Sequence, residues 1–188
     1  ILDDLKASFA KTGQAKFAGL KKADFSYLSK NGKCLTCAGQ GKLKTSMDFM
    51  SDIWLTCDGC KGLRYSDSVL SIKLNGRSIG EVLQMTVTEA IAFFTDQPLL
   101  EKLKVLLQVG VGHLRLGQAG NTLSGGESQR LKLAKAMLEK RKRAILFLFD
   151  EPSTGLHNFD ILKLIKVFQS LVDRGDTVLF IEHNRTFL

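Results

Sequence analysis

The sequence has little proline, no long apolar run and no phosphate-binding loop. Two prolines among 188 residues, together with 44% hydrophobic residues, exclude a long disordered tract and indicate a folded chain. The apolar runs at 144–149 and 178–181 are far shorter than the roughly 20 residues of a membrane-spanning helix. We therefore expect no membrane segment and a cytoplasmic location.

The beginning of the chain has neither an initiating methionine nor the pattern of a signal peptide. ILDDLKASFAKTG carries acids in its first turn and no basic stretch ahead of an apolar core. This start favours a chain that begins inside a longer protein. The motif G-x-x-x-x-G-K-[ST] of P-loop ATPases is also missing, because the Lys-Thr pairs at 11–12 and 44–45 are not preceded by glycine.

Basic residues outnumber acidic ones by 27 to 19, which gives a formal net charge of +8. A surplus of this size favours polyanionic partners such as nucleic acid or phosphates.

The four cysteines all lie within residues 1–68, a segment with many lysines and few apolar runs. We expect such a segment to lack a sufficient side-chain core, so that it needs a cross-link through its cysteines to be stable. From residue 69 onward, apolar residues recur at the spacing of regular helices and strands. We predict two domains, a cysteine-stapled module at 1–68 and a larger domain at 69–188.

The cysteines form two C-x2-C pairs that are separated by nineteen residues, the spacing of a tetrahedral zinc site. The predicted ligands are Cys34, Cys37, Cys57 and Cys60. Glycines in and after each pair allow turns that aim backbone N–H groups at the thiolates. Four thiolates leave no position for water, so the Zn2+ would be structural. The alternatives are two disulfides or four unrelated thiols.

The phrase CLTCAGQG also resembles the repeated knuckles of J-domain co-chaperones, a family that binds unfolded polypeptide. The second cysteine pair continues as CKGLRY and does not repeat that phrase. The resemblance implies an alternative function, a polypeptide-binding zinc module.

The second domain begins with turn and helix signals. Alternation around the Asn-Gly pair at 75–76 predicts a tight β-hairpin. Thr86 and Glu89 form a capping box ahead of a first helix. A second helix is predicted to run over 100–109 and to stop at Gly110.

The most regular helix signal covers residues 127–140. Leu131, Ala134 and Leu138 share one face, which we expect to be buried, whereas Arg130 lies off that face.

A strand–helix–strand pattern ends the chain. Residues 144–149 read as a strand buried on both faces, 161–172 as an amphipathic helix and 177–181 as a second buried strand. A crossover of this length joins parallel strands, so we predict an α/β fold with a parallel sheet.

The phrase LSGGESQR at the start of the 127–140 helix has two interpretations. Ser124 and Glu127 form a capping box. The serine with Gly125 and Gly126 also bares backbone N–H groups at a helix start, where the helix dipole attracts phosphate. Both interpretations can hold at once.

Acidic residues close both predicted strands. Asp150 and Glu151 end the first, as in ATP-splitting enzymes where metal and water meet, and Glu182 with His183 ends the second. Alone, an acid pair at a strand end is typical of a helix cap. Beside a phosphate-facing helix start, the same pair favours a nucleotide site.

These phrases together resemble the ATP-binding-cassette (ABC) ATPases. LSGGESQR resembles their signature motif, ILFLFDEP the Walker B strand, STGLH the D-loop and IEHN the switch-histidine region. The resemblance implies that Asp150 holds Mg2+ through its water shell, Glu151 polarises the attacking water and His183 contacts the γ-phosphate. The residues that it implies for ATP and metal binding are Ser124, Gly125, Gly126, Glu127, Gln129 and Asp150.

In this family, the signature motif acts on a nucleotide held by the P-loop of a facing cassette, so each site is split between two cassettes. The resemblance therefore implies a partial ABC domain that does not hydrolyse ATP by itself.

Over nearly its whole length, the chain resembles the UvrA-type excinuclease subunits. The matching phrases include NGKCLTCAGQGKL, CDGCKGLRY, LGQAGNTLSGGESQRLKLA and DRGDTVLFIEHN. The resemblance implies a DNA-damage sensor of nucleotide excision repair. Its implied partners are double-stranded DNA, a UvrB-type helicase, a second ABC cassette and a homodimer partner. UvrA-like paralogs associated with drug resistance are the alternative.

The same resemblance implies that the zinc module lies close to the duplex. Its basic flanking residues are Lys30, Lys33, Lys42, Lys44, Lys61 and Arg64. Phosphate contacts from such residues give salt-dependent, sequence-independent binding. The alternative is a basic rim that only keeps the module soluble.

Overall fold

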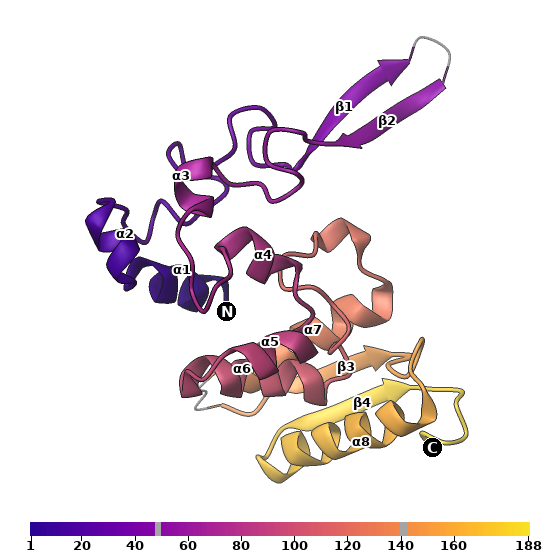
Figure 1. The fold of residues 1–188 in the computed structure, drawn as a ribbon. Helices are drawn as coiled ribbons and strands as arrows, with labels where there is room; N and C mark the ends of the chain where they lie inside the picture. The colour runs from indigo at the N-terminus through magenta and orange to yellow at the C-terminus, as the bar shows by residue number, and fades with distance from the viewer. Residues whose placement is uncertain (48–49, 140–142) are drawn as a thin grey trace. The chain divides into compact units, whose positions relative to one another are not determined.

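The structure is a computed structural model that describes residues 1–47, 50–139 and 143–188 (Figure 1). The chain forms two compact units, 1–84 and 85–188. The predicted zinc module at 1–68 lies within the first unit, and its boundary stays a prediction. Among the described residues, none of the helices has both the length and the apolar character that crossing a bilayer requires.

The first unit combines short helices with one hairpin. Its elements are α1 (Leu2–Ala10), α2 (Gly13–Phe17), β1 (Lys42–Met47), β2 (Met50–Thr56), α3 (Asp67–Leu70) and α4 (Ile79–Gln84).

An apolar core forms in this unit around aromatic residues. Leu5 and Phe9 of α1 are fully buried, and the rings of Phe9 and Phe25 lie 5.8 Å apart. The buried Tyr65 hydroxyl donates to the Phe25 carbonyl oxygen at 3.3 Å. The expectation that the cysteine segment lacks a side-chain core is wrong, because α1 and these aromatic rings supply one.

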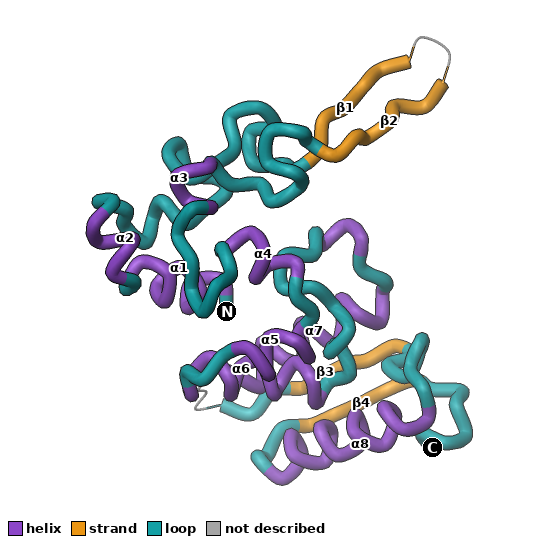
Figure 2. The backbone as a smooth tube through the Cα atoms, in the orientation of Figure 1, coloured by secondary structure: helices purple, strands orange, loops and turns teal. Residues whose placement is uncertain are grey.

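Strands β1 and β2 pair antiparallel, with Lys42 opposite Thr56 and Lys44 opposite Trp54 (Figure 2, orange). The sequence did not reveal this hairpin. The side chains from Asp52 to Thr56 are all exposed. Because neither face is buried there, the strand lacks the alternation by which strands are recognised.

The tight turn predicted at 75–76 is confirmed. Asn75 (φ 47°) and Gly76 (φ 79°) both have positive φ, which a type I′ hairpin turn requires. The short antiparallel strand pair that the hairpin implies is reduced to one bridge. Residues 67–70 form α3, and the turn is flanked by a single bridge between Leu74 and Arg77.

The second unit contains the predicted strand–helix–strand arrangement. Its elements are α5 (Val87–Phe93), α6 (Gln97–Gln108), the 3-10 helix η1 (Gly120–Thr122), α7 (Gly125–Leu138), β3 (Leu146–Asp150), α8 (Asn158–Asp173) and β4 (Thr177–Ile181). Strands β3 and β4 pair in parallel, and α8 forms the crossover between them. The α/β fold with parallel strands is confirmed.

Both helices predicted ahead of residue 110 are present. Thr86 and Glu89 form the capping box of α5. Helix α6 ends at Gln108, and Gly110 (φ 81°) allows the chain to turn after it.

Helix α8 covers one face of the two strands (Figure 1). The Phe168 ring lies 4.7 Å from Phe149 and 6.2 Å from Phe180. On the opposite face, Leu148 and Leu179 are 68% and 61% exposed. Successive strand side chains point to opposite faces, so one helix buries only alternate residues. The prediction of strands buried on both faces is therefore wrong for the described chain.

Helix α7 buries only part of the predicted face, with Ala134 at 1% exposure, and it also buries Arg130. Arg130 is 3% exposed, whereas Leu138 is 38% exposed. Arg130 turns inward because its guanidinium donates to the carbonyl oxygens of Pro152 and Thr154. Lys140, the predicted helix end, lies outside the described residues.

Candidate functional site

The signature phrase begins helix α7 with a capping box, as predicted. The Ser124 hydroxyl accepts from the Glu127 amide at 3.2 Å, and Glu127 Oε2 accepts from the Ser124 amide at 2.8 Å. Ser124 and Gly125 are both exposed. The helix start is therefore open to an incoming group.

The two signature glycines differ in their surroundings. A Cβ at Gly125 would have no atom within 4 Å. A Cβ at Gly126 would lie 3.0 Å from both Arg130 Nη1 and the Thr154 carbonyl oxygen. Gly126 therefore permits the close approach of α7 to the segment after β3. No protein atom crowds the Cβ position of Gly125.

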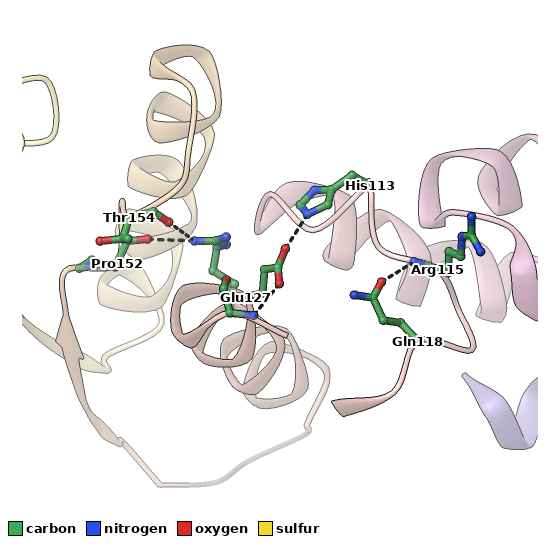
Figure 3. Close-up of polar contacts among 8 residues, drawn as sticks. His113, Arg115, Gln118, Glu127, Pro152 and Thr154 are labelled. Carbon is green, nitrogen blue, oxygen red and sulfur yellow. Dashed lines mark hydrogen bonds and ion pairs between the residues drawn. The ribbon is translucent and has the colours of Figure 1, made fainter. Parts of the chain in front are cut away.

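Glu127 is held within the chain through both carboxylate oxygens. Besides the Ser124 amide, it pairs with His113, whose Nε2 lies 2.8 Å from Glu127 Oε1 (Figure 3). The bond with His113, followed by that from the Ser124 amide, holds the pKa of the Glu127 carboxyl below its ordinary value. Sequence reasoning missed His113, because it lies in the loop after α6 and belongs to none of the recognised motifs.

Asp150 and Glu151 lie at the carboxyl end of β3, where the sequence placed them. Glu151 has a φ of 44°, a left-handed conformation that is uncommon outside glycine. Its amide donates to the Ile181 carbonyl oxygen at 2.9 Å. This bond fixes the turn after β3 to the end of β4.

The structure brings Glu151 and His183 together. His183 Nε2 lies 3.9 Å from Glu151 Oε1, and the Thr154 hydroxyl donates to Glu151 Oε2 at 3.3 Å. Both side chains are exposed. Two residues thirty-two positions apart in the sequence thus meet at one edge of the sheet.

Gln129 and Arg130 tie α7 to the end of β3. Gln129 Nε2 donates to the Asp150 carbonyl oxygen at 3.1 Å. Arg130 Nη1 donates to the carbonyl oxygens of Pro152 and Thr154 at 3.4 and 3.2 Å (Figure 3). Burial lowers the pKa of the Arg130 guanidinium. Sequence reasoning missed Arg130, because an arginine on an amphipathic helix is usually exposed.

Glu182 joins the segment after β3 to the segment after β4. Its Oε2 accepts from the Ser153 amide at 3.1 Å, and its Oε1 accepts from the amides of His183 and Asn184 at 2.9 and 3.1 Å. Burial alone would raise the pKa of this carboxyl, but the bonds from Ser153, Asn184 and His183 outweigh it and lower the pKa.

The four predicted zinc ligands converge in the first unit. Their sulfur atoms all lie within 4.8 Å of one another, and all four cysteines are buried and free. Cys34 and Cys57 sulfurs are 4.0 Å apart, and those of Cys37 and Cys60 are 3.6 Å apart. These separations are too long for a disulfide, whose S–S bond is about 2.0 Å.

The cluster fits a tetrahedral Zn2+. With Zn–S bonds of about 2.3 Å, ligand sulfurs in a tetrahedron lie about 3.8 Å apart, close to the separations observed. The Gly41 amide donates to Cys37 Sγ at 3.1 Å, and the Arg64 amide donates to Cys60 Sγ at 3.4 Å. Gly41 has a φ of 74°, and a Cβ there would lie 2.8 Å from the Gly62 carbonyl oxygen, so glycine is favoured at this turn.

The predicted basic residues surround this cluster and its hairpin. Lys42 and Lys44 lie two residues apart on β1, and Lys44 forms an ion pair with Asp52. Trp54, which the sequence analysis did not select, is 52% exposed opposite Lys44. The remaining four lie on loops of the same unit, and the Arg64 guanidinium stacks over a tyrosine ring: Lys30, Lys33, Lys61 and Arg64.

Comparisons with known proteins identify the family. A family model described as ABC transporter matches residues 71–154. UvrABC system protein A of Halalkalibacterium halodurans and that of Bacillus subtilis are each 46% identical over 185 residues, 98% of this chain. The crystal structure of UvrA2 from Deinococcus radiodurans superposes with a TM-score of 0.86 over 98% of the chain, at 38% identity.

The chain belongs to the UvrA family. It spans 19% of the length of each of these two UvrABC system proteins and 23% of the UvrA2 chain. The match to UvrA2 covers both the cysteine cluster and the β3–α8–β4 unit, so the ABC ATPase fold of UvrA accounts for the parallel strands described above.

Proposed function

We propose that the chain is part of a UvrA-type, ATP-dependent DNA-damage recognition subunit and supplies half of a split nucleotide site. The observation that carries this proposal is the meeting of Glu151 and His183, 3.9 Å apart, at the ends of two parallel strands. A carboxylate and an imidazole so placed suit the polarisation of water and the sensing of a γ-phosphate.

Bound ATP and Mg2+ would supply the phosphoanhydride and the cation that neutralises its charge. At the ends of β3 and β4, Asp150 would hold Mg2+ through its water shell and Glu151 would orient the attacking water. The amides at the open start of α7, at Ser124 and Gly125, face the triphosphate held by another cassette. Gly126, Glu127 and Gln129 act behind them by holding the helix in place.

The sequence contains no P-loop, so the grip on the β- and γ-phosphates comes from elsewhere. We propose a second ABC cassette and a homodimer partner as its sources. A UvrB-type helicase as a partner and a cytoplasmic location follow from the family resemblance and belong to the same proposal.

The cysteine cluster would hold one structural Zn2+ at the base of the β1–β2 hairpin. Lys42 and Lys44 on that hairpin, with the loop residues Lys30, Lys33, Lys61 and Arg64, supply cations for the phosphates of a duplex. The exposed Trp54 adds an apolar surface beside them. This combination supports binding to the shape of DNA and not to its sequence.

A UvrA-like resistance paralog is the second candidate. The identity of 46% over 98% of this chain with UvrABC system protein A of Bacillus subtilis supports the excision-repair subunit.

A chimeric protein tests the nucleotide site. The matching 185 residues of the Bacillus subtilis relative are replaced by this chain, and ATP hydrolysis is measured with damaged and undamaged duplexes. We expect Glu151→Gln to lower kcat about 100-fold or more, the usual contribution of a general base. Glu101→Gln, an exposed carboxylate on α6, serves as the control.

Turnover that survives Glu151→Gln would contradict the assignment. Titration of the 188-residue chain with duplex DNA and with an unfolded polypeptide distinguishes DNA binding from the remaining alternative, a polypeptide-binding zinc module. Preference for the polypeptide would favour the zinc knuckle of co-chaperone type.

A further inference from the structure

The segment Pro152–Thr154, where the Walker B phrase passes into the D-loop, is held from two directions. From α7, Arg130 Nη1 donates to the carbonyl oxygens of Pro152 and Thr154. From the end of β4, Glu182 Oε2 accepts from the Ser153 amide. The peptide group that joins Pro152 to Ser153 and the one that follows Thr154 are thus bonded to side chains of two other segments.

The Arg130 contact is a buried one. Arg130 is 3% exposed, and Pro152 and Ser153 are buried as well. Removing a guanidinium from water is costly unless polar groups replace the water. For Nη1 these groups are the carbonyl oxygens of Pro152 and Thr154, so the arginine and this segment depend on each other.

Gly126 shows how closely the helix and the D-loop are matched. A Cβ there would lie 3.0 Å from the Thr154 carbonyl oxygen and from Arg130 Nη1. A displacement of the helix start toward the D-loop therefore has no free space to absorb it.

Glu182 extends the connection to the switch segment. While Oε2 holds Ser153, Oε1 holds the amides of His183 and Asn184. Only a carboxylate accepts through both oxygens, since glutamine would present an acceptor on one side and a donor on the other.

We propose that Arg130 and Glu182 are positioning residues that clamp the D-loop between the start of α7 and the His183 segment. The clamp passes a displacement of α7, caused by nucleotide at the facing site, to Glu151 and His183. Thr154 completes the connection, because its hydroxyl donates to Glu151. The coupling role rests on the proposed nucleotide function, whereas the mechanical connection does not.

Residue-resolved amide exchange of the 188-residue chain by NMR tests the connection without nucleotide. Arg130→Met removes the donors and keeps an unbranched apolar stem. We expect exchange of the His183 and Asn184 amides to accelerate about fivefold or more, the usual size of coupling between connected sites. Arg130 bonds neither amide, so a purely local role would leave them unchanged.

Glu182→Gln provides the reciprocal measurement. We expect faster exchange either at Ser153 or at His183 and Asn184, and Glu182→Ala is expected to accelerate exchange on both sides. Lys132→Met, at an exposed position of α7, is the matched control. If Arg130→Met unfolds the chain, Arg130→Lys, which keeps the charge and a donor, replaces it. Exchange at His183 and Asn184 within twofold of the unsubstituted chain would overturn the clamp.

The chimera supplies the functional readout. We expect Arg130→Met and Glu182→Gln to lower kcat about tenfold to 100-fold, as for a small misplacement of reacting groups, with little change in KM for ATP. If Glu151→Gln abolishes turnover while both clamp variants retain kcat within twofold, the clamp fails and the nucleotide function stands. If Glu151→Gln leaves turnover intact, the nucleotide function fails.

Discussion

Alanine at the two signature glycines should have opposite effects on stability. Replacing a helical glycine by alanine usually stabilises by about 0.4–1 kcal/mol, because the unfolded chain loses freedom. Gly125→Ala meets no atom within 4 Å, so we expect this gain to be kept in part or whole. Gly126→Ala places Cβ 3.0 Å from the Thr154 carbonyl oxygen and from Arg130 Nη1, so these neighbours must shift.

Overpacking of this kind costs about 1–3 kcal/mol. We therefore expect Gly126→Ala to be less stable than Gly125→Ala by at least about 1 kcal/mol, which corresponds to about 4–8 °C in Tm for a unit of this size. Calorimetry of both variants measures the difference. Equal Tm values would show that the D-loop yields freely to the helix and would refute the reasoning from Gly126.

Four further outcomes are expected. Metal analysis should find one Zn2+ per chain, and removal of the metal by a chelator should lower the Tm of the first unit. A metal-free chain with an unchanged Tm would contradict the assignment of the four cysteines as zinc ligands. The Glu81 pKa is lowered from 4.5 to about 2 by bonds from the Ser78 hydroxyl and amide and from Lys73. Because the pKa of Glu81 is depressed in the folded state, this carboxylate contributes fully to the free energy of unfolding above pH 4.5. The contribution is lost as the pH falls toward 2. Glu81→Gln should therefore make the free energy of unfolding depend less on pH between 4.5 and 2. Lys42→Ala with Lys44→Ala should weaken duplex binding equally across sequences and reduce the salt slope by about 0.9 per lost phosphate contact, and a sequence-selective loss would argue against phosphate contacts. The chain alone should not hydrolyse ATP, and turnover abolished by Glu151→Gln would disprove that expectation.

Local signals predicted the parts of the structure that depend on local chemistry. The Ser124–Glu127 capping box needs only residues three apart, and the Asn75-Gly76 turn needs only two residues that tolerate positive φ. The four cysteines were predictable because metal-ligand spacing is itself a local pattern.

Sequence reasoning failed for side chains whose burial or pairing depends on tertiary contacts. Arg130 reads as a solvent-facing residue, and only the carbonyl oxygens of Pro152 and Thr154, twenty-two and twenty-four residues further on, explain its burial. Leu148 and Leu179 read as core residues, yet the described chain offers one covering helix for two sheet faces. His113 meets Glu127 from fourteen residues earlier in the chain, and no local pattern marks that pairing.

Glu151 shows how an exposed catalytic candidate can still be held in place. Its φ of 44° costs about 1–3 kcal/mol in a non-glycine residue and persists only where the surroundings determine it. Here the Glu151 amide is bonded to β4, the Thr154 amide donates to the Glu151 carbonyl oxygen at 3.0 Å, and the Thr154 hydroxyl donates to its carboxylate. Since Arg130 in turn holds Thr154, the direction of the Glu151 carboxylate is set by backbone bonds that reach back to α7, and not by burial of its side chain.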